Sequence, residues 1–151
     1  MAEKQVNEEL NRMVICLGRN LIQYIGESWP WAEDHPEERE AVDRVVRRQQ
    51  ESLRKLVELL EAREEIVDFG TYPDYSEYHY IALDYVLDRL IAAEKGLIAE
   101  IQRAEEVCES DSEALELLRE IAAAEQENLK TLEAAAEARR SAVPAQAASG
   151  S

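Results

Sequence analysis

Apolar side chains recur at spacings of three and four residues through most of this chain, which is the spacing of one face of an α-helix. The pattern predicts four amphipathic helices, over residues 3–28, 34–67, 74–107 and 110–140. Helices of this kind bury their apolar stripes against one another. We therefore predict an all-α fold, in which residues 1–140 form one four-helix bundle.

Turn-forming residues separate the predicted helices. Pro30, between two tryptophans, ends the first helix because proline forces the preceding residue toward an extended conformation. Gly70 and Pro73 mark residues 68–73 as the connection between the second and third helices. From Ser141 onward the periodicity disappears, so we predict a disordered C-terminal tail over residues 141–151.

A few polar side chains interrupt the apolar stripes, half-way along three of the helices. Gln49 lies in the second stripe, Glu94 in the third and Glu125 in the fourth, and Ser52 and Asn128 follow within one turn. A bundle would bring these positions to similar height. Since an isolated carboxylate in a core is costly, we expect the two glutamates to be paired, protonated or bound to a metal.

The composition argues against several classes of partner and indicates a compartment. Seventeen basic and 33 acidic residues give a net charge of −16, which argues against nucleic acid and anionic membranes as partners. The apolar run at residues 13–17 is too short to span a membrane. Cys16 and Cys108 are too few for a disulfide framework, so we expect free thiols in a cytoplasmic protein.

The arrangement of polar residues on the stripes resembles the ferritin-like superfamily. These four-helix bundles hold a di-iron site with a glutamate from the first helix, E-x-x-H from the second, a glutamate from the third and E-x-x-H from the fourth. The resemblance covers about residues 3–140 and implies a crossover connection between helices two and three.

Mapped residue by residue, the resemblance places the third-helix glutamate at Glu94 and the fourth-helix motif at residues 125–128, where Asn128 replaces the histidine. The second-helix motif falls on residues 49–52, which begin with glutamine and end with serine, and the first helix offers only Asn20. Of the family's six metal ligands, this chain has only the two glutamates that fall at Glu94 and Glu125. The resemblance therefore implies a bundle whose di-iron site is mostly lost.

Our leading hypothesis is a non-catalytic binding or scaffolding module. In it the two glutamates are neutralised by Arg48 or by the amides of Gln49, Asn128 and Asn20, and no cofactor is bound. We expect a protein partner or self-association. Isoleucines that lie off the stripes form either a partner face or scattered exposed apolar residues: Ile15, Ile22, Ile66, Ile91 and Ile98.

Two alternatives remain open on the sequence. In one, Glu94 and Glu125 bind iron or manganese, with the amide oxygens of Gln49 and Asn128 as supporting ligands, in a metal-binding or storage protein. His79 would lie roughly 22 Å from Glu94 along a helix, too far to share that site. In the other, a small error in helix phase turns the glutamates toward solvent, and no site exists.

Overall fold

The computed structural model describes residues 2–28, 36–75 and 83–149, and these residues are helical apart from their connections. The helices are α1 (Ala2–Gly18), α2 (Leu21–Ser28), α3 (Pro36–Ala62), α4 (Leu83–Val107) and α5 (Ser112–Ser149). No strand occurs within the described ranges. The predicted all-α class is therefore confirmed for this part of the chain, whereas Pro30 and His79 lie outside the described residues.

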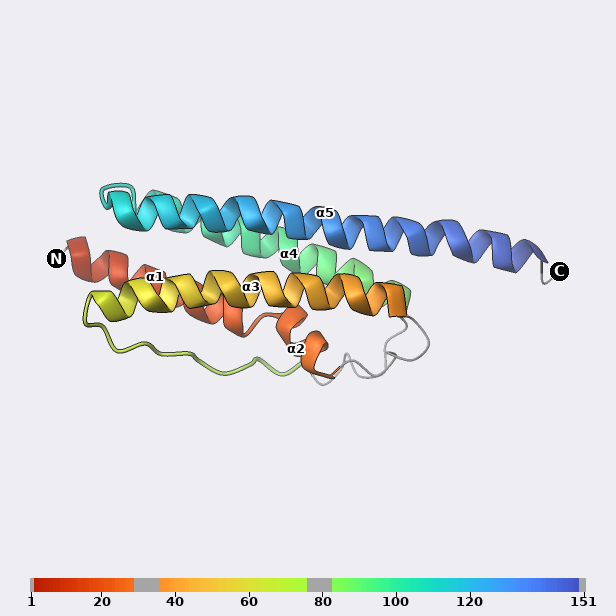
Figure 1. Ribbon diagram of the computed structural model, residues 1–151, viewed down its shortest axis with the longest axis horizontal. Coiled ribbons are helices and arrows are strands. Elements are labelled where there is room, and N and C mark those ends of the chain that lie inside the picture. Colours follow the sequence, from red (N-terminus) through yellow and green to blue (C-terminus); the bar gives the residue numbers. More distant parts are fainter. Residues whose placement is uncertain (1, 29–35, 76–82, 150–151) are drawn as a thin grey trace.

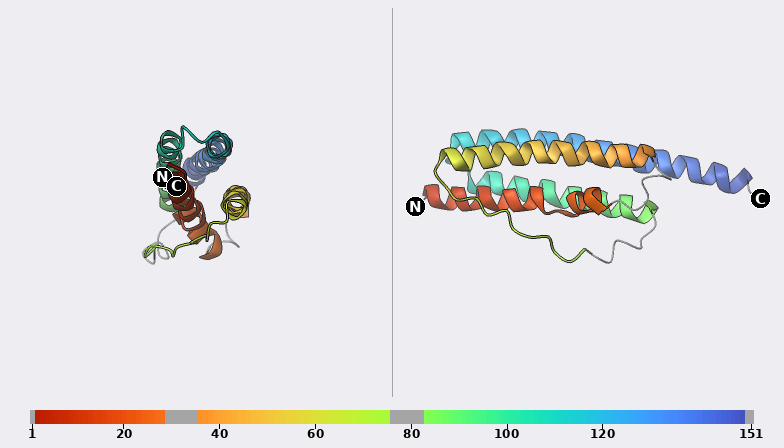
Figure 2. Two further views of the ribbon diagram at one scale, coloured as in Figure 1. Left: turned by 90° about the vertical axis from the view of Figure 1, so that its left-hand side faces the viewer. Right: turned by 60° about the horizontal axis from the view of Figure 1, so that its bottom comes forward.

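The helices lie side by side along one axis, with α2 extending the line of α1 (Figures 1 and 2). The α1–α2 pair packs against α3 and α4, and α5 packs against the same two helices. Counting α1 and α2 as one member, the arrangement is consistent with the predicted four-helix bundle. Every helical member therefore borders two others around a common core.

The connection after α3 runs back along α1. Asn11 Nδ2 donates to the Asp68 carbonyl (2.9 Å), and Arg19 Nε donates to the Gly70 carbonyl (3.3 Å). Further along the connection, the centre of the Tyr72 ring lies 5.6 Å from the centre of the Tyr24 ring in α2. Through these contacts the connection runs along α1 and reaches α2 before residue 75. As a result α3 and α4 point in the same direction (Figure 1).

The first predicted helix is divided in two, which corrects the expectation of one helix over residues 3–28. The break falls at Arg19 and Asn20. Asn20 Nδ2 donates to the carbonyl of Cys16 (3.0 Å), while its Oδ1 accepts from the backbone N–H of Gln23 (3.0 Å). One asparagine thus closes α1 and forms the N-cap of α2, because its side chain competes with the backbone for hydrogen bonds.

Two helix ends also differ from the prediction. The second helix ends at Ala62 rather than near residue 67, because Glu64 adopts a left-handed φ of 61° and closes the helix with a turn. The last helix extends to Ser149, past the predicted tail boundary at 141, and its end projects beyond the other helices (Figure 1). Alanine, which has the highest helix propensity, is frequent there, but Pro144 lies within the same stretch and opposes it.

The core consists of two apolar clusters with a polar layer between them. One cluster joins α1 to the C-terminal half of α3 and of α4 and to the start of α5, and the other joins α2 to the opposite halves. Between them lie buried polar side chains from four helices: Gln23, Gln49, Ser52, Glu94, Glu125 and Asn128. The polar layer therefore lies at mid-height, as the sequence predicts.

We predict opposite effects for two glycine substitutions. A Cβ added at Gly26 would lie 2.7 Å from Val46 Cγ2, whereas one added at Gly96 would meet nothing within 4 Å. Gly26→Ala should lower the free energy of unfolding by about 1–3 kcal/mol, because the branched Val46 side chain has little freedom to move. Gly96→Ala should raise it by about 0.5–1 kcal/mol, because alanine favours the helix.

Urea denaturation of both variants measures these changes. Adding Val46→Ala to Gly26→Ala should recover part of the loss. Equal effects of the two glycine substitutions would contradict the close approach of α2 to α3.

Candidate functional site

The side chain of Gln49 lies between the two buried glutamates. Its Nε2 donates to Glu94 Oε2 (3.1 Å) and to Glu125 Oε2 (3.2 Å), so that α3 contacts α4 and α5 through one amide. Both glutamates and Gln49 are 0% exposed. The alternative that turns the glutamates toward solvent is therefore wrong.

Two donors from the α1–α2 side determine which way the Gln49 amide faces. Gln49 Oε1 accepts from Asn20 Nδ2 (3.1 Å) and from Gln23 Nε2 (3.0 Å). The reverse orientation would set the amide oxygen against two carboxyl groups and its nitrogen against two N–H donors. Because each of those contacts would be repulsive, the nitrogen of Gln49 is held toward the glutamates.

The sequence pattern misses Gln23. A continuous helix over residues 3–28 places it beside the apolar stripe, but the break at Asn20 starts α2 anew and turns Gln23 inward, where it is 4% exposed. Its Nε2 also donates to the Val46 carbonyl (3.1 Å). The asparagine at position 20, inside the long predicted helix, was the available signal, because asparagine favours caps over helix interiors.

Asn128 supplies the next donor. Its Nδ2 donates to Glu125 Oε2 (3.1 Å), and its Oδ1 accepts from Arg48 Nη1 at 3.4 Å. Arg48 itself is exposed and also donates to Thr131 Oγ1 (3.1 Å). Arg48 therefore reaches the glutamates only through Asn128, so of the two predicted possibilities it is the amides of Gln49 and Asn128 that contact the carboxyl groups.

Burial in the polar layer disfavours ionisation of Glu94. The Oε1 atoms of Glu94 and Glu125 are buried and receive no hydrogen bond from any other described group. Burial, then a hydrogen bond and the charge of Glu125, raise the pKa of Glu94 to about 10, while the Gln49 amide acts in the opposite direction. This shift favours the protonated form of Glu94, which has an O–H to donate.

A di-iron centre like that of the ferritin-like superfamily does not fit these residues. Gln49 Nε2 and Asn128 Nδ2 both direct N–H groups at the carboxyl oxygens, and an N–H group cannot bind a metal. Presenting Gln49 Oε1 instead would break its bonds from Asn20 and Gln23. Among the described residues, no group of three or more His, Cys, Asp or Glu side chains could hold a metal ion.

Comparison of the chain with protein-family models, curated proteins and solved structures gave no match. No helix in the described part of the chain is long and apolar enough to cross a membrane. Both cysteines are free, as expected. Because no relative was found, the roles of the buried polar residues follow from their contacts in this structure alone.

We predict that Glu94 makes the stability of the bundle depend on pH. The folded chain holds the Glu94 proton up to about pH 10, whereas an ordinary glutamate releases it near 4.5. The folded state therefore binds more protons between these values, and the free energy of unfolding falls as pH rises through this range. Glu94→Gln keeps a donor beside Glu125 but cannot ionise, so the variant should fold at pH 7 and lose much of this slope.

Thermal unfolding between pH 5 and 9 measures the slope. The exposed Glu106→Gln on the same helix is the matched control and should keep it. A large loss of thermal stability in Glu94→Gln at pH 7 would contradict a neutral role for this side chain.

We also predict that the Gln49 amide is needed for folding stability. Gln49→Met fills a similar volume but removes the amide that donates to Glu94 and Glu125, together with one acceptor of Asn20 and Gln23. Each buried unpaired group costs about 1–3 kcal/mol, so the free energy of unfolding should fall by more than about 2 kcal/mol. The exposed Gln102→Met, measured by the same urea titration, should change it little. Equal effects would show that the network contributes no stability.

Proposed function

We propose that this chain is a ferritin-like bundle without a di-iron centre, which acts as a non-catalytic binding or scaffolding module. Three features support membership of that superfamily. The helices α3 and α4 run in the same direction, and the chain after α3 returns along α1 (Figure 1). Buried polar side chains gather at mid-height, where the family holds its metals. The family's crossover between helices two and three is part of this proposal.

The orientation of the Gln49 amide is the observation that supports a metal-free role. Its two N–H groups meet both carboxyl groups, and its oxygen is occupied by Asn20 and Gln23. In this arrangement hydrogen bonds and one proton replace the positive charge that two metal ions would supply. We therefore expect that this layer catalyses no reaction that needs a bound metal.

One feature favours the alternative of a protein that binds or stores iron or manganese. Glu94 Oε1 and Glu125 Oε1 are buried oxygens without a hydrogen-bond donor from another group. A single divalent ion could replace the shared proton there, since carboxylate oxygens suit manganese and ferrous iron. It would still face the N–H groups of Gln49 and Asn128, so we favour the metal-free function.

We predict that the protein carries no stoichiometric iron or manganese. The test is metal content by mass spectrometry, on protein purified without chelator from iron- and manganese-supplemented cells. The Glu94→Ala/Glu125→Ala double variant is the control, and both preparations should contain equally little metal.

Near-stoichiometric metal that disappears in the double variant would contradict the proposed function and support the storage alternative. Equilibrium dialysis against manganese distinguishes loss of metal during purification from absence of a site. The wild-type chain should show no saturable binding up to near-millimolar manganese.

A further inference from the structure

A groove of about 580 Å³ opens between α1, the connection that follows α3, and α4. This volume lies within the range of about 300–1,000 Å³ that is typical of small-molecule sites. Its walls are mostly apolar, with Ile15 and Leu21 on one side and Leu97 on the other. The small side chains of Ala92 and Ala93 leave space along α4. The groove can therefore cover an aliphatic chain of several carbons.

The two arginines that border this groove are already engaged within the chain. Arg19 Nε donates to the Gly70 carbonyl (3.3 Å), and its guanidinium lies 5.1 Å from the centre of the Tyr72 ring. Arg89 Nη2 donates to the Tyr85 hydroxyl, and its guanidinium lies 4.8 Å from the centre of that ring. Arg89 also has a further partner. An anion in the groove would have to compete with these contacts.

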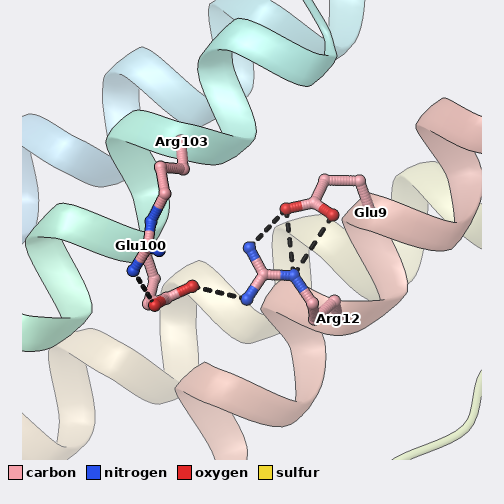
Figure 3. Close-up of polar contacts among 4 residues, drawn as sticks. All are labelled: Glu9, Arg12, Glu100 and Arg103. Atoms are coloured by element: carbon pink, nitrogen blue, oxygen red, sulfur yellow. Dashed lines mark hydrogen bonds and ion pairs between the residues drawn. The ribbon is translucent and has the colours of Figure 1, made fainter.

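The carboxylate of Glu100 also borders the groove, and it is paired as well. Arg12 Nη1 donates to Glu100 Oε2 (2.5 Å), and Arg103 donates to the other oxygen of the same carboxylate (Figure 3). Arg12 is shared with Glu9 of its own helix. These bonds lower the pKa of Glu100, because they stabilise its ionised form. A cation in the groove would have to displace one of the two arginines from Glu100.

Two uncharged polar groups at the groove, by contrast, are available to a ligand. They are the Thr71 hydroxyl, on the exposed connection, and the partly exposed Cys16 thiol, on α1. Among the described residues, neither group has a hydrogen-bond partner. A threonine hydroxyl can both donate and accept a hydrogen bond. The groove thus combines apolar walls and engaged charges with one hydroxyl that is free to bond.

We propose that this groove binds a small uncharged aliphatic molecule with one hydroxyl group, namely a medium-chain alcohol. The ligand's hydroxyl would bond to Thr71, and its chain would lie over Ala92, Ala93 and Leu97. The charges of the groove favour this occupant over an ionised one, because burying an ion that finds no free counter-charge is costly. This inference rests on the proposed function, since it names a ligand for a bundle taken to be a binding module.

The test is calorimetric titration of the full chain with 1-octanol at physiological salt. Saturable one-to-one binding is expected. 1-Hexanol buries two fewer methylene groups, so it should bind at least fivefold more weakly. Octanoate and octylammonium carry a similar apolar body with a charge of either sign, and each should bind at least tenfold more weakly than octanol.

Cys16 gives a direct report on occupancy. Its thiol lines the groove, whereas Cys108 is buried in the apolar core and serves as the internal reference. Burial raises the pKa of the Cys16 thiol, so its alkylation is slow enough to follow by mass spectrometry. Saturating octanol covers this thiol and should slow its reaction with iodoacetamide at least fivefold.

Two tryptophan variants test whether octanol lies in the groove. Ala92 and Ala99 are both exposed on α4, but Ala92 lines the groove and Ala99 does not. Ala92→Trp should abolish octanol binding without unfolding the chain, whereas Ala99→Trp should change the affinity less than twofold. Thr71→Val keeps the shape of the side chain but removes its hydroxyl, and should weaken octanol binding at least threefold.

A third pair of substitutions tests why charged ligands are disfavoured. Arg12→Gln/Arg103→Gln removes both partners of Glu100 and leaves its carboxylate facing the groove. Octylammonium should then bind at least fivefold more tightly than it binds the wild-type chain, while the affinity for octanol stays within twofold. Unchanged octylammonium binding would show that the internal pairs do not determine the preference for a neutral ligand.

Three further results would overturn the inference: no saturable octanol binding, equal binding of octanol and either ion, or equal effects of the two tryptophan variants. Sedimentation velocity tests for another occupant, because a dimer that octanol dissociates would assign the groove to a second copy of the chain. The metal content of the same preparation is measured separately. A metal-loaded protein would contradict the proposed function whatever octanol does, and metal-free protein that ignores octanol would overturn only this inference.

Discussion

Two carboxyl groups, those of Glu94 and Glu125, are buried around one amide in the middle of this bundle, and satisfying them there is the constraint on which the rest depends. Burying one unpaired carboxylate is costly, and burying two side by side costs more. The N–H groups of the Gln49 amide reach both partners, and burial raises the pKa of Glu94, which favours its neutral form. The amide of Asn128 also donates to Glu125.

The same polar layer determines the register of the helices. Apolar clusters lie on both sides of it, so an axial shift of one turn would move Glu94 or Gln49 against leucine and leave its hydrogen bonds unmade. Asn20 connects the layer to the break in the first helix, since its amide donates both to Gln49 and to the end of α1. The interruption between α1 and α2 and the mid-bundle network are therefore parts of one structure.

The periodicity of apolar residues was enough to predict the helical class and the inward position of Glu94, Glu125 and Gln49, because burial follows helix phase over long, regular segments. The break at Asn20 was not predicted, since hydrophobic periodicity continues across it, and Gln23 was missed with it. Arg48 was placed near the glutamates, but periodicity does not show whether a long side chain at the edge of a stripe turns inward or toward solvent. The groove between α1, the connection that follows α3, and α4 is formed by segments that only the folded chain brings together.

We propose that one proton, and no metal, holds Glu94 and Glu125 together. Infrared spectroscopy of the metal-free protein at neutral pH tests it most directly, because a protonated carboxylic acid has a carbonyl band distinct from that of an ionised carboxylate. We expect one such band, which is absent from Glu94→Gln and unchanged in the exposed Glu106→Gln. If wild-type protein lacks the band, both glutamates are ionised, the pair requires a bound cation, and the metal-free account is wrong.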